Sequence, residues 1–321
     1  MVSIHRSPPY KSIACAHSIV CCLFLVLTLD VKHARTQIPS TSGSKANAME
    51  SSFLLLNTDI RDGFLSMTLV LGGESTVETT ANTDRQEIGR YRCRLRDETY
   101  RQCAELLQKS GFEKIDTSGE LEPGVAMIAF GKGGGNEIVL KSVPLSKVPE
   151  SVQPFVRAMK DASEKIRENK LRVLSGDASS VKAVFKTDEP IAFRLRFSNT
   201  GIETLKFKNP LKGKGAQSSI SLLIQSVAMK EPSKPTVLDV ARSNLAFSSD
   251  SSKDLDPPSE GLVSLLADQT LELRLTKKMY LKPGTYRAAI TAHFTNQNPE
   301  DPTEIVGGLT MDVQNFSIEP N

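Results

Sequence analysis

The stretch IAFRLRFSNTG, residues 191–201, decides how the C-terminal half of this chain folds. Its apolar and polar or small side chains alternate, with Ile191, Phe193, Leu195 and Phe197 on one side and Ala192, Arg194, Arg196 and Ser198 on the other. A period of two is typical of a β-strand that buries one face. Asn199-Thr200-Gly201 then supplies the residue types that favour a turn.

The same alternation recurs through the rest of this half. Further strands are predicted at Leu205–Phe207, Ile220–Val227, Leu271–Leu275, Tyr286–Phe294 and Leu309–Val313. Asn209-Pro210 and Pro283-Gly284 mark turns between them. About seven short strands punctuated by turns predict an all-β sandwich over residues 173–321.

Residues 51–172 follow a different order of hairpin, helix, hairpin, helix. The first hairpin joins FLLLNTDI (53–60) to FLSMTLVL (64–71) through Arg61-Asp62-Gly63, and the second joins VAMIAF (125–130) to EIVLKS (137–142). Apolar residues at helical spacing follow each hairpin, at Tyr100, Cys103, Ala104 and Leu107, and at Val152, Phe155, Val156, Met159 and Ile166. This order predicts an α+β domain with helices on one face of an antiparallel sheet.

One predicted strand carries a row of arginines. In RYRCRLR, Tyr91, Cys93 and Leu95 face one way and Arg90, Arg92, Arg94 and Arg96 the other. Four guanidinium groups on one face could bind a carboxylate or phosphate ligand, since each offers a fork of donors. The alternative is a solvated face whose charges discourage edge-to-edge pairing of sheets.

Cys93 and Cys103 are the cysteines outside the N-terminal region, and both point toward the core of the α+β domain. In an oxidising compartment such a pair favours a disulfide. The alternative is two small buried apolar side chains.

The N-terminus resembles an export signal. A leader with Arg6 and Lys11 precedes the eleven apolar residues IVCCLFLVLTL (19–29), and a polar segment follows. Positive, apolar and polar regions in this order predict a signal peptide over residues 1–34, or a signal anchor if it is not cleaved. A Ser/Thr-rich linker, residues 35–50, would lead into the α+β domain. We therefore expect an extracytoplasmic protein, periplasmic or secreted, that meets the membrane only through an uncleaved N-terminus.

The charge outside this region is nearly zero. The first 48 residues hold Arg6, Lys11, Lys32, Arg35 and Lys45 against Asp30, which is +4, so the total of +3 leaves −1 for the rest. A near-neutral body speaks against nucleic acid as a partner, because binding to phosphates needs clustered Lys and Arg.

Few residues suggest a cofactor or a metal. His293 is the single histidine beyond residue 48, and its alternation places it on the solvent side of its strand. The glycines of Gly131–Gly135 lack the spacing of a P-loop. The carboxylates of an acidic loop, Asp250, Asp254, Asp256 and Glu260, could supply oxygen ligands to calcium, but their spacing does not fit the EF-hand loop, and the alternative is a solvated loop. We expect no cofactor and no metal.

The C-terminal half resembles bacterial immunoglobulin-like domains of exported proteins. TDEPIAFRLRFSNTG, followed by Leu281-Lys282-Pro283-Gly284-Thr285-Tyr286, carries this resemblance. In that family a tyrosine starts the penultimate strand and its hydroxyl bonds back across the corner, and Tyr286 matches this position. The N-terminal half resembles only uncharacterised exported α+β domains.

These observations favour an exported, non-enzymatic binding protein whose partner is another extracytoplasmic protein or an envelope component. No arrangement of residues typical of catalysis is recognisable. The alternative is a secreted hydrolase accessory or a protease-inhibitor-like protein.

Overall fold

The computed structural model describes residues 53–60, 64–71, 74–79, 86–117, 125–134, 137–211, 217–227, 236–247, 261–295, 301 and 303–321. The predicted signal segment and linker, the turn at residues 61–63 and the acidic loop with the calcium candidates lie outside these residues. In the described part, no helix is long and apolar enough to cross a membrane.

The described residues form mostly β-strands, and nearly all of their pairings are antiparallel. The larger sheet has the order β13-β15-β9-β7-β4-β3-β2-β1-β5-β6, the smaller one β12-β11-β16-β17-β8, and β10 pairs with β14. The strands of the larger sheet are β1 (Phe53–Ile60), β2 (Phe64–Leu71), β3 (Glu74–Thr79), β4 (Glu87–Arg94), β5 (Met127–Gly134), β6 (Glu137–Pro144), β7 (Lys170–Ser180), β9 (Ile191–Asn199), β13 (Leu245–Phe247) and β15 (Thr270–Lys277). The others are β8 (Val184–Lys186), β10 (Leu205–Lys208), β11 (Gln217–Ser226), β12 (Thr236–Ala241), β14 (Leu262–Leu265), β16 (Gly284–Phe294) and β17 (Gly307–Glu319).

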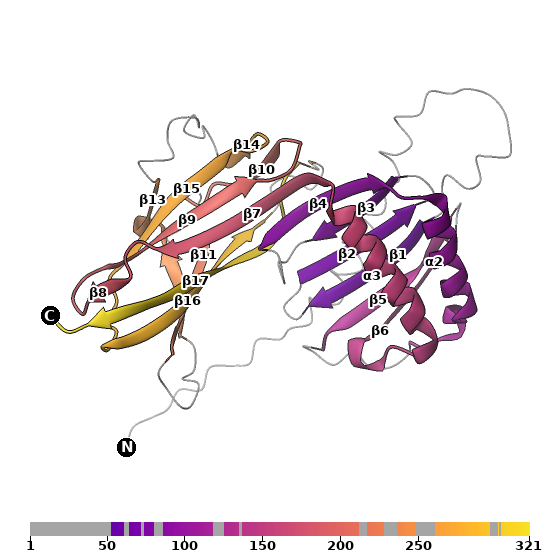
Figure 1. The fold of residues 1–321 in the computed structure, drawn as a ribbon, viewed down its shortest axis with the longest axis horizontal. Helices are drawn as coiled ribbons and strands as arrows, with labels where there is room; N and C mark the ends of the chain where they lie inside the picture. Colours follow the sequence, from indigo (N-terminus) through magenta and orange to yellow (C-terminus); the bar gives the residue numbers. More distant parts are fainter. Residues whose placement is uncertain are drawn as a thin grey trace, which may run out of the picture. The chain divides into compact units, whose positions relative to one another are not determined.

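Two helices, α2 (Asp97–Lys109) and α3 (Gln153–Arg167), cover one face of the N-terminal strands (Figure 1). Gly111 follows α2 in the left-handed conformation, at φ 64°, which a residue without Cβ adopts at little cost. Pro154 lies in the first turn of α3, where its missing N–H breaks no helical hydrogen bond. Phe155, Met159 and Ile166 are buried against side chains of the sheet.

A second core lies between the C-terminal strands of the larger sheet and the five-stranded sheet. Phe193, Leu195 and Phe197 of β9 are fully buried in it, as the alternation in residues 191–198 predicts. From the opposite side β16 contributes Ile290 and β17 contributes Phe316. The Phe193 and Phe316 rings meet edge to face, with centroids 5.7 Å apart.

Strand β7 joins the two cores because its buried face changes sides along its length. Val173 packs with the helices and Leu174 packs with the second core, and both are fully buried although neighbouring residues of a strand point to opposite faces. β7 pairs with β4 on one edge and with β9 on the other. The larger sheet is therefore continuous from one core to the other.

The domain boundary predicted between residues 172 and 173 falls inside β7. The helix before it, α3, ends at Arg167, and Lys170 already belongs to β7. The alternation of β7 is hard to recognise because both of its faces are buried in part. The two predicted hairpins are β1–β2 and β5–β6.

Candidate functional site

The predicted arginine row is partly occupied by ion pairs with the neighbouring strand. Arg90 pairs with Glu78 at 3.0 Å and Arg92 with Glu74 at 3.4 Å. Both glutamates belong to β3, which lies beside β4 in register. The solvated-face alternative therefore describes these two arginines better than a ligand site does.

The row also ends earlier than the sequence predicts. β4 stops at Arg94, and Arg96 is the N-cap residue of α2, so Arg96 lies beyond the end of the strand. The chain has to leave the sheet after Arg94 because α2 already begins at Asp97. The predicted strand is therefore too long by two residues, and Arg96 falls outside it. Neither Arg94 nor Arg96 forms an ion pair with another described residue.

Cys93 and Cys103 are free thiols, so the predicted disulfide is not present in this structure. Cys103 on α2 is fully buried, and Cys93 on β4 packs partly buried against the same core. Burial, with a smaller effect of Asp161, raises the pKa of the Cys103 thiol to about 11. The neutral thiol behaves as a small apolar side chain, which is the alternative that the sequence left open.

Tyr286 lies near the start of β16, and its hydroxyl donates a hydrogen bond to the Lys282 carbonyl oxygen at 2.8 Å. This is the backward bond that the resemblance implies for Tyr286. Its ring stacks on Phe316 with centroids 6.0 Å apart. The tyrosine thus ties the turn before β16 to the second core.

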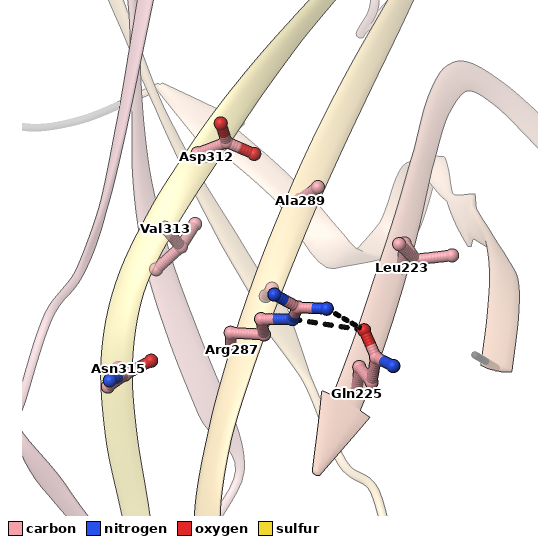
Figure 2. A pocket seen from close by; sticks show the side chains of 8 residues that line it. Leu223, Gln225, Arg287, Ala289, Asp312, Val313 and Asn315 are labelled. Atoms are coloured by element: carbon pink, nitrogen blue, oxygen red, sulfur yellow. Dashed lines mark hydrogen bonds between the residues drawn. The ribbon is translucent and has the colours of Figure 1, made fainter. Parts of the chain in front are cut away.

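A hollow of about 340 Å³ lies on the outer face of the five-stranded sheet, away from the core. Figure 2 shows its lining side chains, which come from β11, β16 and β17. Ala289 lies in the middle, paired with Leu223 on one side and with Asp312 on the other. Because a methyl group is flanked by longer side chains, the surface is lower at Ala289 than around it.

A β-bulge shapes the lower end of this hollow. The register between β16 and β17 shifts by one residue between Tyr286 and Ala288. Such a bulge sets two residues against one on the partner strand, so Gln314 and Asn315 both lie opposite Arg287 and are both exposed. Asn315 thereby reaches the lining of the hollow.

Arg287 is held in place by its neighbour across the sheet. Its Nε and Nη2 groups both donate to Oε1 of Gln225, with the Nε distance at 3.0 Å. Figure 2 shows the remaining guanidinium nitrogen turned away from Gln225. Asp312 is exposed on the other side of Ala289, and neither Arg287 nor Asp312 forms an ion pair with another described residue.

Sequence reasoning missed this hollow. Arg287 and Ala289 alternate with the core-facing residues of β16, but Gln225 and Asp312 come from distant segments whose register no local pattern reveals. His293 is exposed on β16, on the side that the alternation predicts. Among the described residues, no group of three or more His, Cys, Asp or Glu side chains could hold a metal ion.

Comparison with known proteins does not assign a family. The chain matches no protein-family model and no curated protein sequence. Part of it is similar to the solved structure of AvmM, described as catalysing macrocyclization in alchivemycin A biosynthesis, at 11% identity and a TM-score of 0.28 over 46% of this chain and 89% of that chain. A CARDB domain from Pyrococcus furiosus, in complex with di-metal ions, gives 11% identity and a TM-score of 0.23 over 47% of this chain and 97% of that chain. Red sea bream transglutaminase gives 8% identity and a TM-score of 0.21 over 84% of this chain and 27% of that chain.

Proposed function

We propose that this chain is an exported, non-enzymatic binding protein. In this proposal an immunoglobulin-like sandwich, residues 173–321, presents the binding surface, and an α+β layer, residues 51–172, supports it. The apolar run at residues 19–29 supports export. The tyrosine bond at the start of β16 supports the immunoglobulin-like assignment.

The observation that carries the binding role is the hollow around Ala289. Its described lining residues offer one guanidinium, one carboxylate and two amide groups beside the apolar side chains of Leu223 and Ala289, which is the usual make-up of a site that binds by charge and hydrogen bonds. Gln225 already fixes the orientation of Arg287, so little side-chain entropy is lost when a ligand arrives.

The arginine row on β4 is the weaker candidate for the same role. Two of its members are engaged with Glu78 and Glu74, and an incoming anion would have to displace both carboxylates. The hollow requires no such exchange, because Arg287 and Asp312 form no ion pair with the described residues.

Partner capture with matched variants tests the proposal. The full chain and an Arg287→Gln/Asp312→Asn variant are used as baits against envelope extract and culture fluid, with Arg274→Gln as control. Arg274 is exposed on β15 in the other sheet. A partner retained by the wild type and the control but lost from the double variant supports the proposal. The same partner retained by all three baits, or no partner in either fraction, overturns it.

Export is tested separately by fractionating cells that express the native chain. Recovery in the periplasm or the culture fluid is expected, and intact-mass measurement shows whether the N-terminus is removed. Recovery of the full-length chain from the soluble cell interior overturns the export part of the proposal.

A further inference from the structure

The two charges of the hollow that form no ion pair with described residues have opposite signs and lie on neighbouring strands. Asp312 is paired in register with Ala289, and Arg287 lies two residues along the same strand. In a regular antiparallel pair such diagonal neighbours have backbone positions roughly 7–8 Å apart, and the bulge beside Arg287 adds one residue of β17 to this stretch. A ligand that satisfies both must therefore carry a negative and a positive group some distance apart.

The guanidinium end is suited to a carboxylate. Because Gln225 takes the Nε and Nη2 hydrogens, the direction of the guanidinium plane is set before binding. The nitrogen turned away from Gln225 in Figure 2 stays available as a charged donor. Charge-assisted hydrogen bonds of this kind are among the stronger polar contacts in proteins.

The surface between the two charges is apolar. Ala289 and Leu223 supply the outward-facing apolar side chains of the hollow, and Ala289 leaves room above its methyl group. None of the described residues that line the hollow is aromatic, so these residues offer a sugar ring no stacking partner. A short aliphatic chain fits this floor because it buries apolar surface against methyl groups.

We infer that the hollow binds a C-terminal lysine of a partner protein. The α-carboxylate lies against Arg287, the aliphatic stem crosses Ala289, and the ε-ammonium reaches Asp312. A C-terminal lysine carries both charges on one residue, and its stem supplies the apolar stretch between them. This inference rests on the proposed binding function and names the chemistry of the partner at that same site.

The probe is 6-aminohexanoate, which has as many carbon atoms between its carboxylate and its ammonium as lysine has between its α-carboxylate and its ε-ammonium. Titration of the full chain is followed by NMR shifts of backbone amides in β11, β16 and β17. Hexanoate and hexylamine, which each lack one charge, are expected to bind at least tenfold more weakly, because each leaves one charged side chain without its partner.

Single variants separate the two ends of the site. Arg287→Gln and Asp312→Asn are each expected to weaken 6-aminohexanoate binding at least tenfold, while Arg274→Gln leaves it unchanged. Arg287→Gln is expected to make 6-aminohexanoate and hexylamine bind alike, since the carboxylate no longer has a partner. Both variants change exposed side chains, so thermal midpoints close to that of the wild type check that the fold is kept.

Equal binding of hexanoate and 6-aminohexanoate overturns the inference, and so does the absence of amide shifts at saturating probe. Partner capture that still depends on Arg287 and Asp312 would then leave the binding function standing and show only that the ligand is of another kind. If 6-aminohexanoate does not bind and partner capture does not depend on Arg287 and Asp312, the inference and the proposed function are both overturned.

Discussion

Gly89 on β4 lies where the two cores meet, and replacing it by alanine should destabilise the protein more than replacement of any glycine in open space. Its φ is 140°, in the region that L side chains rarely adopt. A Cβ at this position would lie 2.1 Å from the Arg172 carbonyl oxygen and 2.9 Å from the Val173 Cα. The neighbour is backbone of β7, so it can move only by separating the two strands.

The expected cost has two parts. Holding alanine at this φ costs about 2 kcal/mol. Separating β4 from β7 enough to relieve the collision weakens one or two ladder hydrogen bonds, at about 1 kcal/mol each. We therefore expect the free energy of unfolding of Gly89→Ala to fall by about 3 kcal/mol or more.

Gly111→Ala is the matched control. Gly111 also has a positive φ, at 64°, but a Cβ there would meet nothing within 4 Å. Left-handed strain of about 1–2 kcal/mol, offset by the lower entropy of the unfolded chain, leaves a net cost of about 1 kcal/mol. Most of the expected difference between the two variants therefore comes from the collision with β7, and the rest comes from the different φ values.

Urea denaturation of the chain without its predicted signal segment measures both values, with far-UV circular dichroism as the signal. A single transition that moves to lower urea in Gly89→Ala is the expected result, because the strand pair β4–β7 belongs to both cores. Equal losses of stability in the two variants would mean that β4 and β7 do not lie in close contact at Gly89, and the larger sheet would then not be continuous there.

Three further outcomes are expected. Thr303 donates to Asp301 through its hydroxyl and its backbone N–H, and these bonds lower the pKa of the Asp301 carboxyl to about 2. Asp301→Asn should therefore cost about 1–2 kcal/mol of stability at neutral pH. Because a lowered pKa stabilises the fold at pH values above the unfolded pKa of about 3.9, the difference in thermal midpoint between the variant and the wild type should shrink as the pH falls toward 2. Tyr286→Phe removes the bond to the Lys282 carbonyl and should cost about 1 kcal/mol in urea denaturation, whereas an unchanged midpoint would mean that the bond contributes nothing. Cys103, with its pKa raised to about 11, should resist iodoacetamide at pH 8 in the folded protein and react with it in urea. Peptide mass spectrometry measures the labelling. Equally fast labelling in both states, or a Cys93–Cys103 bridge, would contradict the burial of Cys103 as a free thiol.

Local sequence patterns were sufficient to predict a helix or strand wherever one face of that element packs against a single core. The alternation over residues 191–198 matches β9, and the helical spacing of Val152 to Ile166 matches α3. Each signal needs only that buried side chains recur with the period of the element. The same reasoning failed at β7, because Val173 and Leu174 are buried on opposite faces and the period of two is lost there.

The sequence by itself determined the kinds of element, the apolar face of most strands and the place of Tyr286 at a strand start, because these depend on neighbours along the chain. Tertiary structure alone decided which strands lie side by side. It brought Glu78 to Arg90, set Gln225 against Arg287, and placed Asp312 across from Ala289. The register between distant strands follows from the packing of both cores and from the bulge beside Arg287. Neither feature can be recognised in a short stretch of sequence.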